Sequence, residues 1–414
     1  MKISIVIPTR NRSEFLEYCL QTCLASPDDG IEIVVSDNNS SDATRDVVGS
    51  FVDKRLHYHN PGQDLSMRQN FEFALSKATG DYIIFIGDDD GILPNGIATL
   101  RYLIETYHPD IVTWRHITYI WPKPDPLPED GLLKFRYRDF CGPFYNLDPV
   151  QILSDFCQAK LTNYRDGANI YHGCVSRKII EKIKKKGGEY FQGQIPDVNT
   201  SITNLTAAKS ILWVRNPVTI AGEGWKSNGI ALNSSGKTTT EQKEIATNFT
   251  SLAQKDKIVA ELDLRIRSIP AYTYANLLRV NQDHLDGSCQ IDHERWRQRI
   301  IEDMRKYPPE NRCWSVLEAF FQTADPAYEI RNLSEPKPPI TEAVQEEPAV
   351  PGRPKKRKKY VDPQYTENVA TVVDWLQSVT GKPYYPKKWP LVAFIEQISK
   401  SVEMCRNVKL IEKT

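Results

Sequence analysis

The sequence predicts an α/β protein with a mostly parallel sheet flanked by helices, and two features of its first 110 residues predict this class. Short runs rich in Ile, Val and aromatic residues alternate with segments whose apolar residues recur at helical spacing, which is the pattern of βαβ units. The short runs are apolar at almost every position, as in Tyr82 to Ile86. Such continuous runs are typical of parallel strands that are buried on both faces.

The individual elements follow from these patterns. The apolar runs predict strands at 3–7, 31–35, 56–58, 82–86 and, later in the chain, 211–214. The helical stripes predict helices at 13–24, with Ser13 as N-cap, and at 42–51, 66–78, 97–107 and 179–186, the last of these basic. Residues 249–325 are expected to be mainly helical, so the fold class includes a mainly helical C-terminal extension.

Composition changes divide the chain at about 225, 333 and 360. A proline-rich loop is expected at 121–128, and the Gly-, Ser-, Thr- and Asn-rich stretch 222–240 predicts either a lid over a site or an ordinary surface loop. The polar loop and helical region is expected to span 226–333. A proline-rich, basic linker at 334–360 and a small helical appendage at 361–414 complete the predicted organisation.

The overall charge of the chain does not indicate a nucleic acid or a membrane as its partner. Lys plus Arg and Asp plus Glu both total 53, so the formal net charge is zero. The eight cysteines form no CxxC pair and no zinc spacing, which predicts reduced thiols in a cytoplasmic protein. No signal peptide or transmembrane segment is expected, although a peripheral position at a membrane surface stays open.

Three consecutive carboxylates, Asp88, Asp89 and Asp90, follow the predicted strand 82–86 after a single glycine. In open α/β sheets, ligands bind beyond the carboxyl ends of the strands. Three carboxylates there repel one another, and a hard divalent cation would relieve that repulsion. The triplet therefore predicts a metal site, while a solvated acidic turn is the alternative.

Two other predicted strands also end in polar loops. The strand at 3–7 runs into 8–12 (Pro-Thr-Arg-Asn-Arg) and the strand at 31–35 into 36–42 (Ser-Asp-Asn-Asn-Ser-Ser-Asp). If these strands are parallel, all three loops meet at one edge of the sheet and form a ligand crevice. The chain has neither GxGxxG after its first strand nor GxxxxGK[ST], which argues against a dinucleotide fold and a P-loop.

In this order and spacing, four segments resemble the inverting family 2 glycosyltransferases of the GT-A fold: 4–12, 34–42, 78–82 and 87–90, with Leu93-Pro94 after the last. The resemblance implies a Rossmann-like GT-A domain over 1–225, with a nucleotide-sugar half at about 1–110 and an acceptor half at about 111–225. It implies metal-dependent, inverting transfer of a sugar from a nucleoside-diphosphate sugar, most often a UDP-sugar, to an acceptor hydroxyl of a glycan, a lipid-linked molecule or another compound.

The resemblance also assigns donor and metal residues. Nucleotide-sugar contacts are expected from Pro8, Thr9, Arg10, Arg12, Asp37, Asn39, Arg68, Asp88 and Asp89. Asp88 and Asp90 would form a DxD motif that holds Mn²⁺ or Mg²⁺ against the donor pyrophosphate, and Asp89 could replace either of them. For Arg68, a helix-surface arginine is the alternative to a phosphate contact.

Inverting transfer needs a general base to accept the proton of the attacking hydroxyl. Family members place this base in a Glu-Asp pair about a hundred residues after the DxD motif, and Asp197 matches that position here, with Pro196 in place of the glutamate. A helix cap is the alternative role for Asp197. His172 lies in the stretch expected to meet the acceptor and is predicted as an acceptor contact.

The cluster Lys355 to Lys359 follows Gly352-Arg353-Pro354 and partly resembles an AT-hook, so this segment predicts a contact with DNA, a contact with an anionic membrane, or a solvated linker. The acceptor itself is not identified by the sequence. Three alternatives to transfer onto a glycan or lipid remain: a glycosyltransferase that acts on modified bases in DNA through its basic tail, a nucleotidyltransferase, and a non-catalytic protein that binds nucleic acid or membrane.

Overall fold

The computed structural model describes residues 1–93, 96–121, 133–134, 144–214, 217–227, 240–257, 262–263, 265–329 and 333. The predicted basic linker, its cluster Lys355 to Lys359 and the C-terminal appendage lie outside the described residues. Most of the predicted loop at 121–128 and of the polar stretch 222–240 lie outside them as well.

An eight-stranded sheet forms the centre of the protein, in the order β3-β2-β1-β4-β10-β6-β11-β9. Its strands are β1 (Ile3–Thr9), β2 (Ile31–Asp37), β3 (Leu56–His59), β4 (Tyr82–Phe85), β6 (Ile111–Trp114), β9 (Tyr145–Leu147), β10 (Gly173–Ser176) and β11 (Ile211–Val214). The pairs β1–β2, β1–β4, β2–β3 and β6–β11 are parallel, whereas β9 and β10 run antiparallel to their neighbours. The predicted α/β class with a mostly parallel sheet is confirmed.

Each face of this sheet packs against its own helices, because alternate strand residues point to opposite faces. In β1, Ile3, Ile5 and Ile7 belong to one core and Val6 to the other. The first core contains α1 (Ser13–Leu24), α2 (Thr44–Gly49) and α4 (Gly96–Tyr107). The second contains α3 (Met67–Lys77), α6 (Arg177–Gly187) and α7 (Pro196–Ala207). This double cover explains why the strand runs are apolar at nearly every position.

The start of α1 differs from its prediction. Ser13 is the first helical residue, and the N-cap position falls to Arg12, whose side chain makes no capping hydrogen bond. The Arg12 side chain instead reaches the acidic triplet. By contrast, Ser66 caps α3 with a full capping box, in which Ser66 and Gln69 exchange side-chain to backbone hydrogen bonds.

A second, four-stranded sheet has the order β5-β12-β7-β8 and was not anticipated from the sequence. Its strands are β5 (Gly91–Ile92), β7 (Ile117–Ile120), β8 (Leu133–Lys134) and β12 (Thr219–Glu223). Since β5 begins directly after the acidic triplet, its pairing with β12 brings residues 219–224 alongside the three aspartates. The strands are too short to be recognised by periodicity alone.

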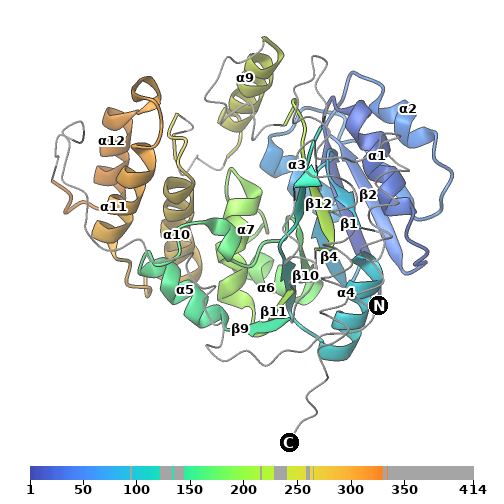
Figure 1. Ribbon diagram of the computed structural model, residues 1–414, viewed down its shortest axis with the longest axis horizontal. Helices are drawn as coiled ribbons and strands as arrows, with labels where there is room; N and C mark the ends of the chain where they lie inside the picture. Colours follow the sequence, from blue (N-terminus) through green and yellow to red (C-terminus); the bar gives the residue numbers. More distant parts are fainter. Residues whose placement is uncertain are drawn as a thin grey trace, which may run out of the picture.

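The described part of 249–325 is mainly helical, as predicted. It contains the end of α9 (Thr240–Gln254), then α10 (Ile269–Leu285), α11 (His293–Met304), the short 3₁₀ turn η3 (Pro309–Asn311) and α12 (Trp314–Ala324). Helix α5 (Pro149–Cys157) and the 3₁₀ turn η2 (Tyr164–Asp166) lie earlier in the chain and were not predicted. Helices α10, α11 and α12 lie on the side of the molecule away from α1 and α2 (Figure 1). Because α10 packs on α7, the second core continues from the sheet to the buried Trp296 of α11.

Two cysteines correct the expectation of reduced thiols. Cys157 at the end of α5 and Cys289 before α11 form a disulfide across a sequence separation of 132. Among the described residues, Cys19, Cys23, Cys174 and Cys313 are free. The scattered cysteine spacing does not reveal this pair, since the pair depends on how α5 and the segment before α11 pack together.

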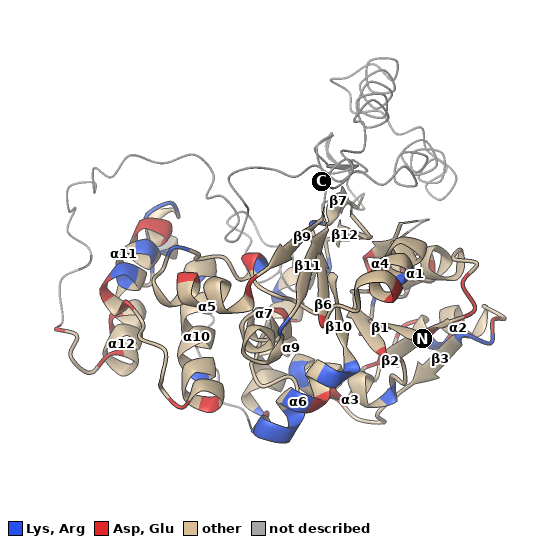
Figure 2. Cartoon of the chain, turned by 90° about the horizontal axis from the view of Figure 1, so that it is seen from below, with Lys and Arg blue, Asp and Glu red and all other residues tan. Residues whose placement is uncertain are grey.

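Helix α6 is the basic helix that the sequence predicts. Ile179, Ile180 and Ile183 are buried against the sheet, whereas Lys178, Lys182 and Lys185 are exposed. Figure 2 shows the resulting basic surface on α6 beside α3. Across the described residues, no helix combines the length and apolar character needed to cross a membrane.

Candidate active site

Three strand ends meet where the sequence predicts a crevice. Thr9, the last residue of β1, lies opposite Asp37, the last residue of β2, in the parallel register. The Thr9 hydroxyl donates to Asp88 Oδ2 at 2.5 Å, just beyond the end of the adjacent β4. The parallel pairing of β1 with β2 and β4 therefore brings the three polar loops to one edge.

The acidic triplet is buried, and its first two members share one cation. Asp88, Asp89 and Asp90 are 1%, 6% and 5% exposed. Arg12 Nη1 donates to Asp88 Oδ1 at 2.6 Å and lies 3.4 Å from Asp89 Oδ1. This burial excludes the alternative of a solvated acidic turn, because a solvated turn would leave its carboxylates in water.

Asp90 has a separate set of partners on the other side of the triplet. Its Oδ2 accepts hydrogen bonds from the Tyr171 hydroxyl at 2.7 Å and the Gly87 amide at 2.6 Å, and lies 3.2 Å from His172 Nε2. Its Oδ1 accepts from the amide of Gly222 at 2.8 Å. Both oxygens of the Asp90 carboxylate thus accept hydrogen bonds from protein groups.

Strand β12 and the residues next to it contact Asp89. The Gly224 amide donates to Asp89 Oδ2 at 3.2 Å, and Trp121 Nε1 donates to the Asp89 carbonyl at 2.8 Å. A Cβ atom at Gly222 would lie 1.8 Å from that same carbonyl oxygen, so only glycine permits this approach. No sequence motif marked Gly222, Gly224 or Trp121 as site residues. They lie beside Asp89 because β12 pairs with both β5 and β7.

The three carboxyl groups differ in their electrostatic surroundings. Burial, together with repulsion from Asp88 and Asp90, raises the pKa of Asp89 to about 7 despite the charge of Arg12. Burial also raises the pKa of Asp88. For Asp90 burial acts in the same direction, but the adjacent His172 and the hydrogen bonds from Tyr171 and Gly222 lower its pKa to about 2. The ionised forms of Asp88 and Asp89 are therefore disfavoured in this environment, whereas Asp90 is ionised.

The triplet suits a hard divalent cation in its chemistry, since it offers buried carboxylate oxygens with one guanidinium for three acidic groups. Its oxygens do not converge on a point, however: within the described residues, no three His, Cys, Asp or Glu side chains are grouped as metal ligands. Asp88 turns toward Thr9 and Arg12, whereas Asp90 turns toward Tyr171 and His172.

The predicted donor-binding loops are tied together by hydrogen bonds. Arg10 Nη2 and Asn39 Nδ2 both donate to Asp64, at 3.1 and 2.9 Å. The other guanidinium nitrogen of Arg10, Nη1, is buried and has no hydrogen-bond partner in the described part of the chain. A buried donor without a partner is costly, so Nη1 is a group that a bound ligand would satisfy.

Asp37 is also held by neighbours, because it accepts from Tyr58 Oη at 2.6 Å, from Asn60 Nδ2 at 3.3 Å and from the Ser40 amide at 2.9 Å. The polar surroundings of Asp37 therefore include Tyr58 of β3 and Asn60 just after it, which the sequence did not single out. Pro8 stays in β1 opposite Ser36. The nucleotide contacts predicted for these residues remain predictions.

Arg68 does not lie on the helix surface. It is 2% exposed, and its guanidinium is bound by Asp256, Glu189 and the carbonyl of Phe191. Its alternative interpretation as a surface arginine is wrong. The contact with donor phosphates predicted for Arg68 stays a prediction, and the structure gives the guanidinium protein partners instead.

Asp197 lies in the first turn of α7, after Pro196 at the first helical position. Ile195 occupies the N-cap position, so Asp197 is not the cap of this helix. Tyr164 in η2 donates a hydrogen bond to the Asp197 carboxylate, and the charge of Arg165 acts on it. Burial nevertheless raises the pKa of Asp197, which is the direction expected of a general base.

His172, predicted to contact the acceptor, is 7% exposed. Its backbone is left-handed, with φ of 54°, and its Nδ1 lies 2.8 Å from Thr219 Oγ1 while Nε2 faces Asp90. The ring of His116 packs against it with centroids 4.7 Å apart. The structure thus shows His172 orienting Asp90, and its contact with an acceptor remains a prediction.

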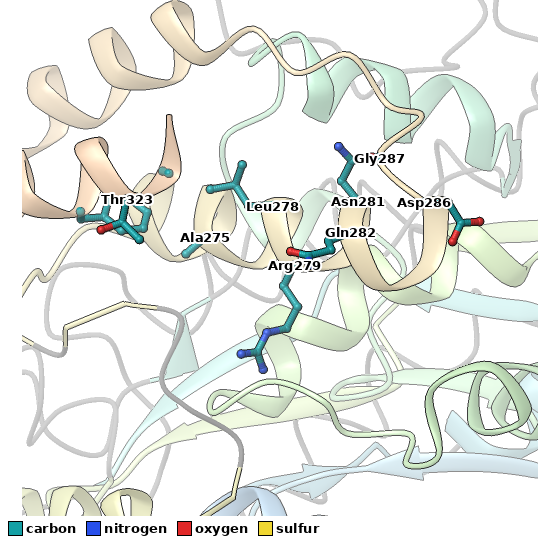
Figure 3. A pocket seen from close by; sticks show the side chains of 10 residues that line it. Ala275, Leu278, Arg279, Asn281, Gln282, Asp286, Gly287 and Thr323 are labelled. Carbon is teal, nitrogen blue, oxygen red and sulfur yellow. The ribbon is translucent and has the colours of Figure 1, made fainter. Parts of the chain in front are cut away.

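A cavity of about 670 Å³ lies elsewhere, between α10 and α12 (Figure 3). Its lining includes Arg279 and Asp286 from α10 and the residue after it, and it contains none of the predicted site residues. The predicted chemistry is therefore concentrated at the carboxyl edge of the large sheet and not at this cavity.

The fold and this edge define an α/β protein with polar strand ends, three buried carboxylates and a further carboxylate in the first turn of a helix. Residues 4–153 match the family model described as Glycosyl transferase family 2. This segment therefore matches a family 2 glycosyltransferase domain, in agreement with the resemblance seen in the sequence motifs.

Most of the curated relatives are named as glycosyltransferases. Over 102 residues the chain is 34% identical to the GalNAc(5)-diNAcBac-PP-undecaprenol beta-1,3-glucosyltransferase of Campylobacter jejuni, covering 24% of this chain and 33% of the relative. Over 111 residues it is 32% identical to the abequosyltransferase RfbV of Salmonella typhimurium, covering 26% and 33%. The chain thus spans about a third of the length of these relatives. Among solved structures, TarS 1–349 of S. aureus overlaps 75% of this chain and 82% of its own, with 12% identity and a TM-score of 0.42.

Proposed function

We propose that this protein transfers a sugar from a nucleoside-diphosphate sugar, with a UDP-sugar as the first candidate, to an acceptor hydroxyl with inversion at the sugar carbon. One observation carries the proposal: Asp88, Asp89 and Asp90 are buried at the carboxyl edge of a sheet whose neighbouring strand ends supply Thr9, Arg12 and Asp37. The match of residues 4–153 to family 2 supports the same reaction class.

The donor half of the site would bind the nucleotide between the loops after β1 and β2. Arg10 Nη1, the buried nitrogen without a partner, is suited to an oxygen of the nucleotide or its phosphates. Asp37 and Asn39 would contact the base or ribose, and Arg12 would balance charge where the pyrophosphate approaches the triplet. The hydrogen bonds between the two loops preorganise this half.

Mn²⁺ or Mg²⁺ is proposed as the cofactor, with Asp88 and Asp90 as the predicted ligands and Asp89 as the third available carboxylate. A divalent cation supplies Lewis-acid stabilisation of the departing nucleoside diphosphate. The raised pKa values of Asp88 and Asp89 support a need for positive charge at this point. Tyr171, His172 and Gly222 would hold Asp90 in position.

Asp197 is proposed as the general base that accepts the proton of the attacking hydroxyl. Tyr164 and Arg165 both lower the pKa of Asp197. Arg165 also lowers the pKa of His116, and the charge of Asp90 raises it. This chain of neighbours supports a position for Asp197 on the acceptor side of the triplet. The position of Asp197 at the N-terminus of α7 is rigid, because Pro196 and the buried Val198 flank it.

The proposal is tested by measuring nucleotide release and sugar transfer with a panel of nucleotide sugars and EDTA-treated protein. We expect one donor to be hydrolysed or transferred, activity to return with Mn²⁺ or Mg²⁺, and Asp90→Asn to abolish that metal dependence together with most activity. Asp197→Asn should lower transfer by roughly 10²- to 10⁴-fold while the donor still binds. Unchanged turnover in both variants would exclude the proposed roles.

The same assay separates the alternatives. A glycosyltransferase releases the nucleoside diphosphate, whereas a nucleotidyltransferase that uses a nucleoside triphosphate releases pyrophosphate. If the acceptor is a modified base in DNA, sugar would be incorporated into duplex DNA, and this incorporation would depend on Lys355 to Lys359. A non-catalytic binding protein would consume none of the donors. A cytoplasmic location is proposed on the sequence alone, with a peripheral position at a membrane surface as the open alternative.

A further inference from the structure

Two exposed arginines lie at the active-site edge beyond the acidic triplet, and neither belongs to the predicted donor contacts. Arg115 directly follows Trp114, the last residue of β6. Arg165 is the middle residue of η2, next to Tyr164, the hydrogen-bond donor to Asp197. Both therefore flank the half of the site that contains the candidate base.

The strand order fixes where Arg115 lies relative to the triplet. Strand β10 pairs antiparallel with both β4 and β6, so β4 and β6 are parallel and their carboxyl ends share one edge. Because neighbouring strands are about 4.8 Å apart, the end of β6 lies roughly 10 Å along this edge from the end of β4. Tyr171 and His172, which precede β10, occupy the interval.

Both arginines lower the pKa of His116. Burial, the neighbouring His172 and the charge of Arg165 lower the pKa of His116 to about 3, and Arg115 contributes in the same direction. His116 is consequently neutral, and both guanidinium groups lie near it. The Arg165 charge faces Asp197 and Glu223. The Arg115 guanidinium, by contrast, makes no hydrogen bond or ion pair with any of the residues that the structure describes.

Arg165 is also held in place before any ligand arrives. Its amide donates to Asn163 Oδ1 at 3.0 Å, and the Tyr164 amide donates to Thr273 Oγ1 at 3.2 Å. Its guanidinium lies over the Tyr164 ring, 5.8 Å from the centroid. Gly167 packs so closely that a Cβ atom would lie 2.5 Å from the Ser201 carbonyl oxygen. The turn that presents Arg165 is thus preorganised against α7.

We propose that Arg115 and Arg165 form an anion subsite for the acceptor, so that the acceptor carries a phosphate or carboxylate group close to the hydroxyl that is glycosylated. A guanidinium fork binds both groups through paired, charge-assisted hydrogen bonds. The inference rests on the proposed glycosyltransferase function and defines its acceptor class. A neutral glycan would leave the Arg115 guanidinium without a counter-charge.

The test measures binding of small acceptor fragments by isothermal titration calorimetry in the presence of saturating UDP, which fills the donor half. The probes are glycerol phosphate, methyl glucuronide and uncharged methyl glucoside. We expect one charged probe to bind at least tenfold more tightly than methyl glucoside, which identifies phosphate or carboxylate as the acceptor group. Arg115→Gln and Arg165→Gln should each weaken that probe about tenfold or more and leave the dissociation constant of UDP unchanged.

Arg299→Gln is the matched control, since Arg299 is an exposed arginine of α11 and its side chain is 43% exposed. It should bind every probe like the unmodified protein. Equal affinity for charged and neutral probes, or unchanged binding in Arg115→Gln, would overturn the inference. So would displacement of the charged probe by UDP, because the arginines would then belong to the donor half. If no nucleotide binds, the proposed function fails, and the anion subsite is then judged from the same titrations without UDP.

Discussion

Arg68 in α3 and Asp256, which lies 188 residues later, form a buried ion pair with two hydrogen bonds. Arg68 Nε lies 2.8 Å from Asp256 Oδ2 and Nη2 lies 2.7 Å from Oδ1. The two side chains are 2% and 4% exposed. Since Asp256 follows the end of α9, this pair attaches α9 to the N-terminus of α3, at the edge of the sheet that holds the candidate site.

Breaking this pair should destabilise the protein, because the remaining charge would stay buried and lose its two paired hydrogen bonds. Arg68→Gln should lower the free energy of unfolding by about 3–5 kcal/mol. Asp256→Asn should lower it by less, since Glu189 still pairs with Arg68. Arg68→Lys should recover part of that loss, since an ammonium cannot reproduce the paired geometry. Urea unfolding followed by circular dichroism measures all three.

The same variants test the donor contact predicted for Arg68. Asp256→Asn removes the carboxylate but keeps the guanidinium, whereas Arg68→Gln removes the guanidinium. If Arg68 contacts donor phosphates, UDP affinity falls in Arg68→Gln and persists in Asp256→Asn. If its role is to attach α9, the two variants affect UDP affinity alike.

Glu32 of β2 is a second buried carboxylate with a structural role. It accepts hydrogen bonds from Ser4 Oγ at 2.6 Å and from the Thr79 amide at 2.5 Å, and Lys2 Nζ lies 2.5 Å away. Burial alone would raise the pKa of Glu32, but these groups together lower it from 4.5 to about 2. A folded-state pKa below the unfolded value stabilises the protein above pH 4.5, and this stabilisation is lost as pH falls toward 2.

Glu32→Gln should therefore cost roughly 1–3 kcal/mol at neutral pH, and the difference from the unmodified protein should shrink between pH 4.5 and 2. Glu181→Gln is the control, since Glu181 is exposed on α6. Melting temperatures recorded across this pH range provide the measurement. A constant difference at all pH values would show that Glu32 acts through packing and not through its charge.

The disulfide between Cys157 and Cys289 links α5 to the segment that precedes α11. Cross-linking residues this far apart in sequence restricts the unfolded chain. Cys157→Ser, Cys289→Ser or reduction with dithiothreitol should lower the free energy of unfolding by about 2–4 kcal/mol. Cys313→Ser, at a free cysteine, should have little effect. Mass spectrometry of the alkylated, non-reduced protein should show both Cys157 and Cys289 protected from alkylation.

The sequence predicted what local patterns determine, and missed what long-range pairing determines. Apolar runs and polar strand ends identified β1, β2 and β4, and hence Thr9, Asp37 and the aspartate triplet as neighbours. Gly222 and Tyr171 reach Asp90 through β12 and β10, whose four or five residues carry no period that distinguishes them. For the same reason, the partners of Arg68 and Cys157 could not be read from spacing, because they lie 188 and 132 residues away.

The hydrogen bond from Tyr164 to Asp197 makes a specific prediction about the pH dependence of sugar transfer. A general base acts when ionised, so the rate should rise with pH through the Asp197 pKa, which burial places above its ordinary 3.8. The Tyr164 hydroxyl and the Arg165 charge lower this pKa. Tyr164→Phe should therefore raise it further and move the acidic limb of the kcat profile upward by about 0.4–1 pH unit, the equivalent of one hydrogen bond.

Tyr102→Phe is the control for this shift, since Tyr102 is 40% exposed on α4. Its profile should coincide with that of the unmodified protein, and Asp197→Asn should have no acidic limb in whatever activity remains. A limb that stays in place in Tyr164→Phe but disappears in Asp197→Asn would mean that the hydroxyl does not set the Asp197 pKa. A limb that survives Asp197→Asn would assign the proton transfer to another group, because asparagine cannot titrate.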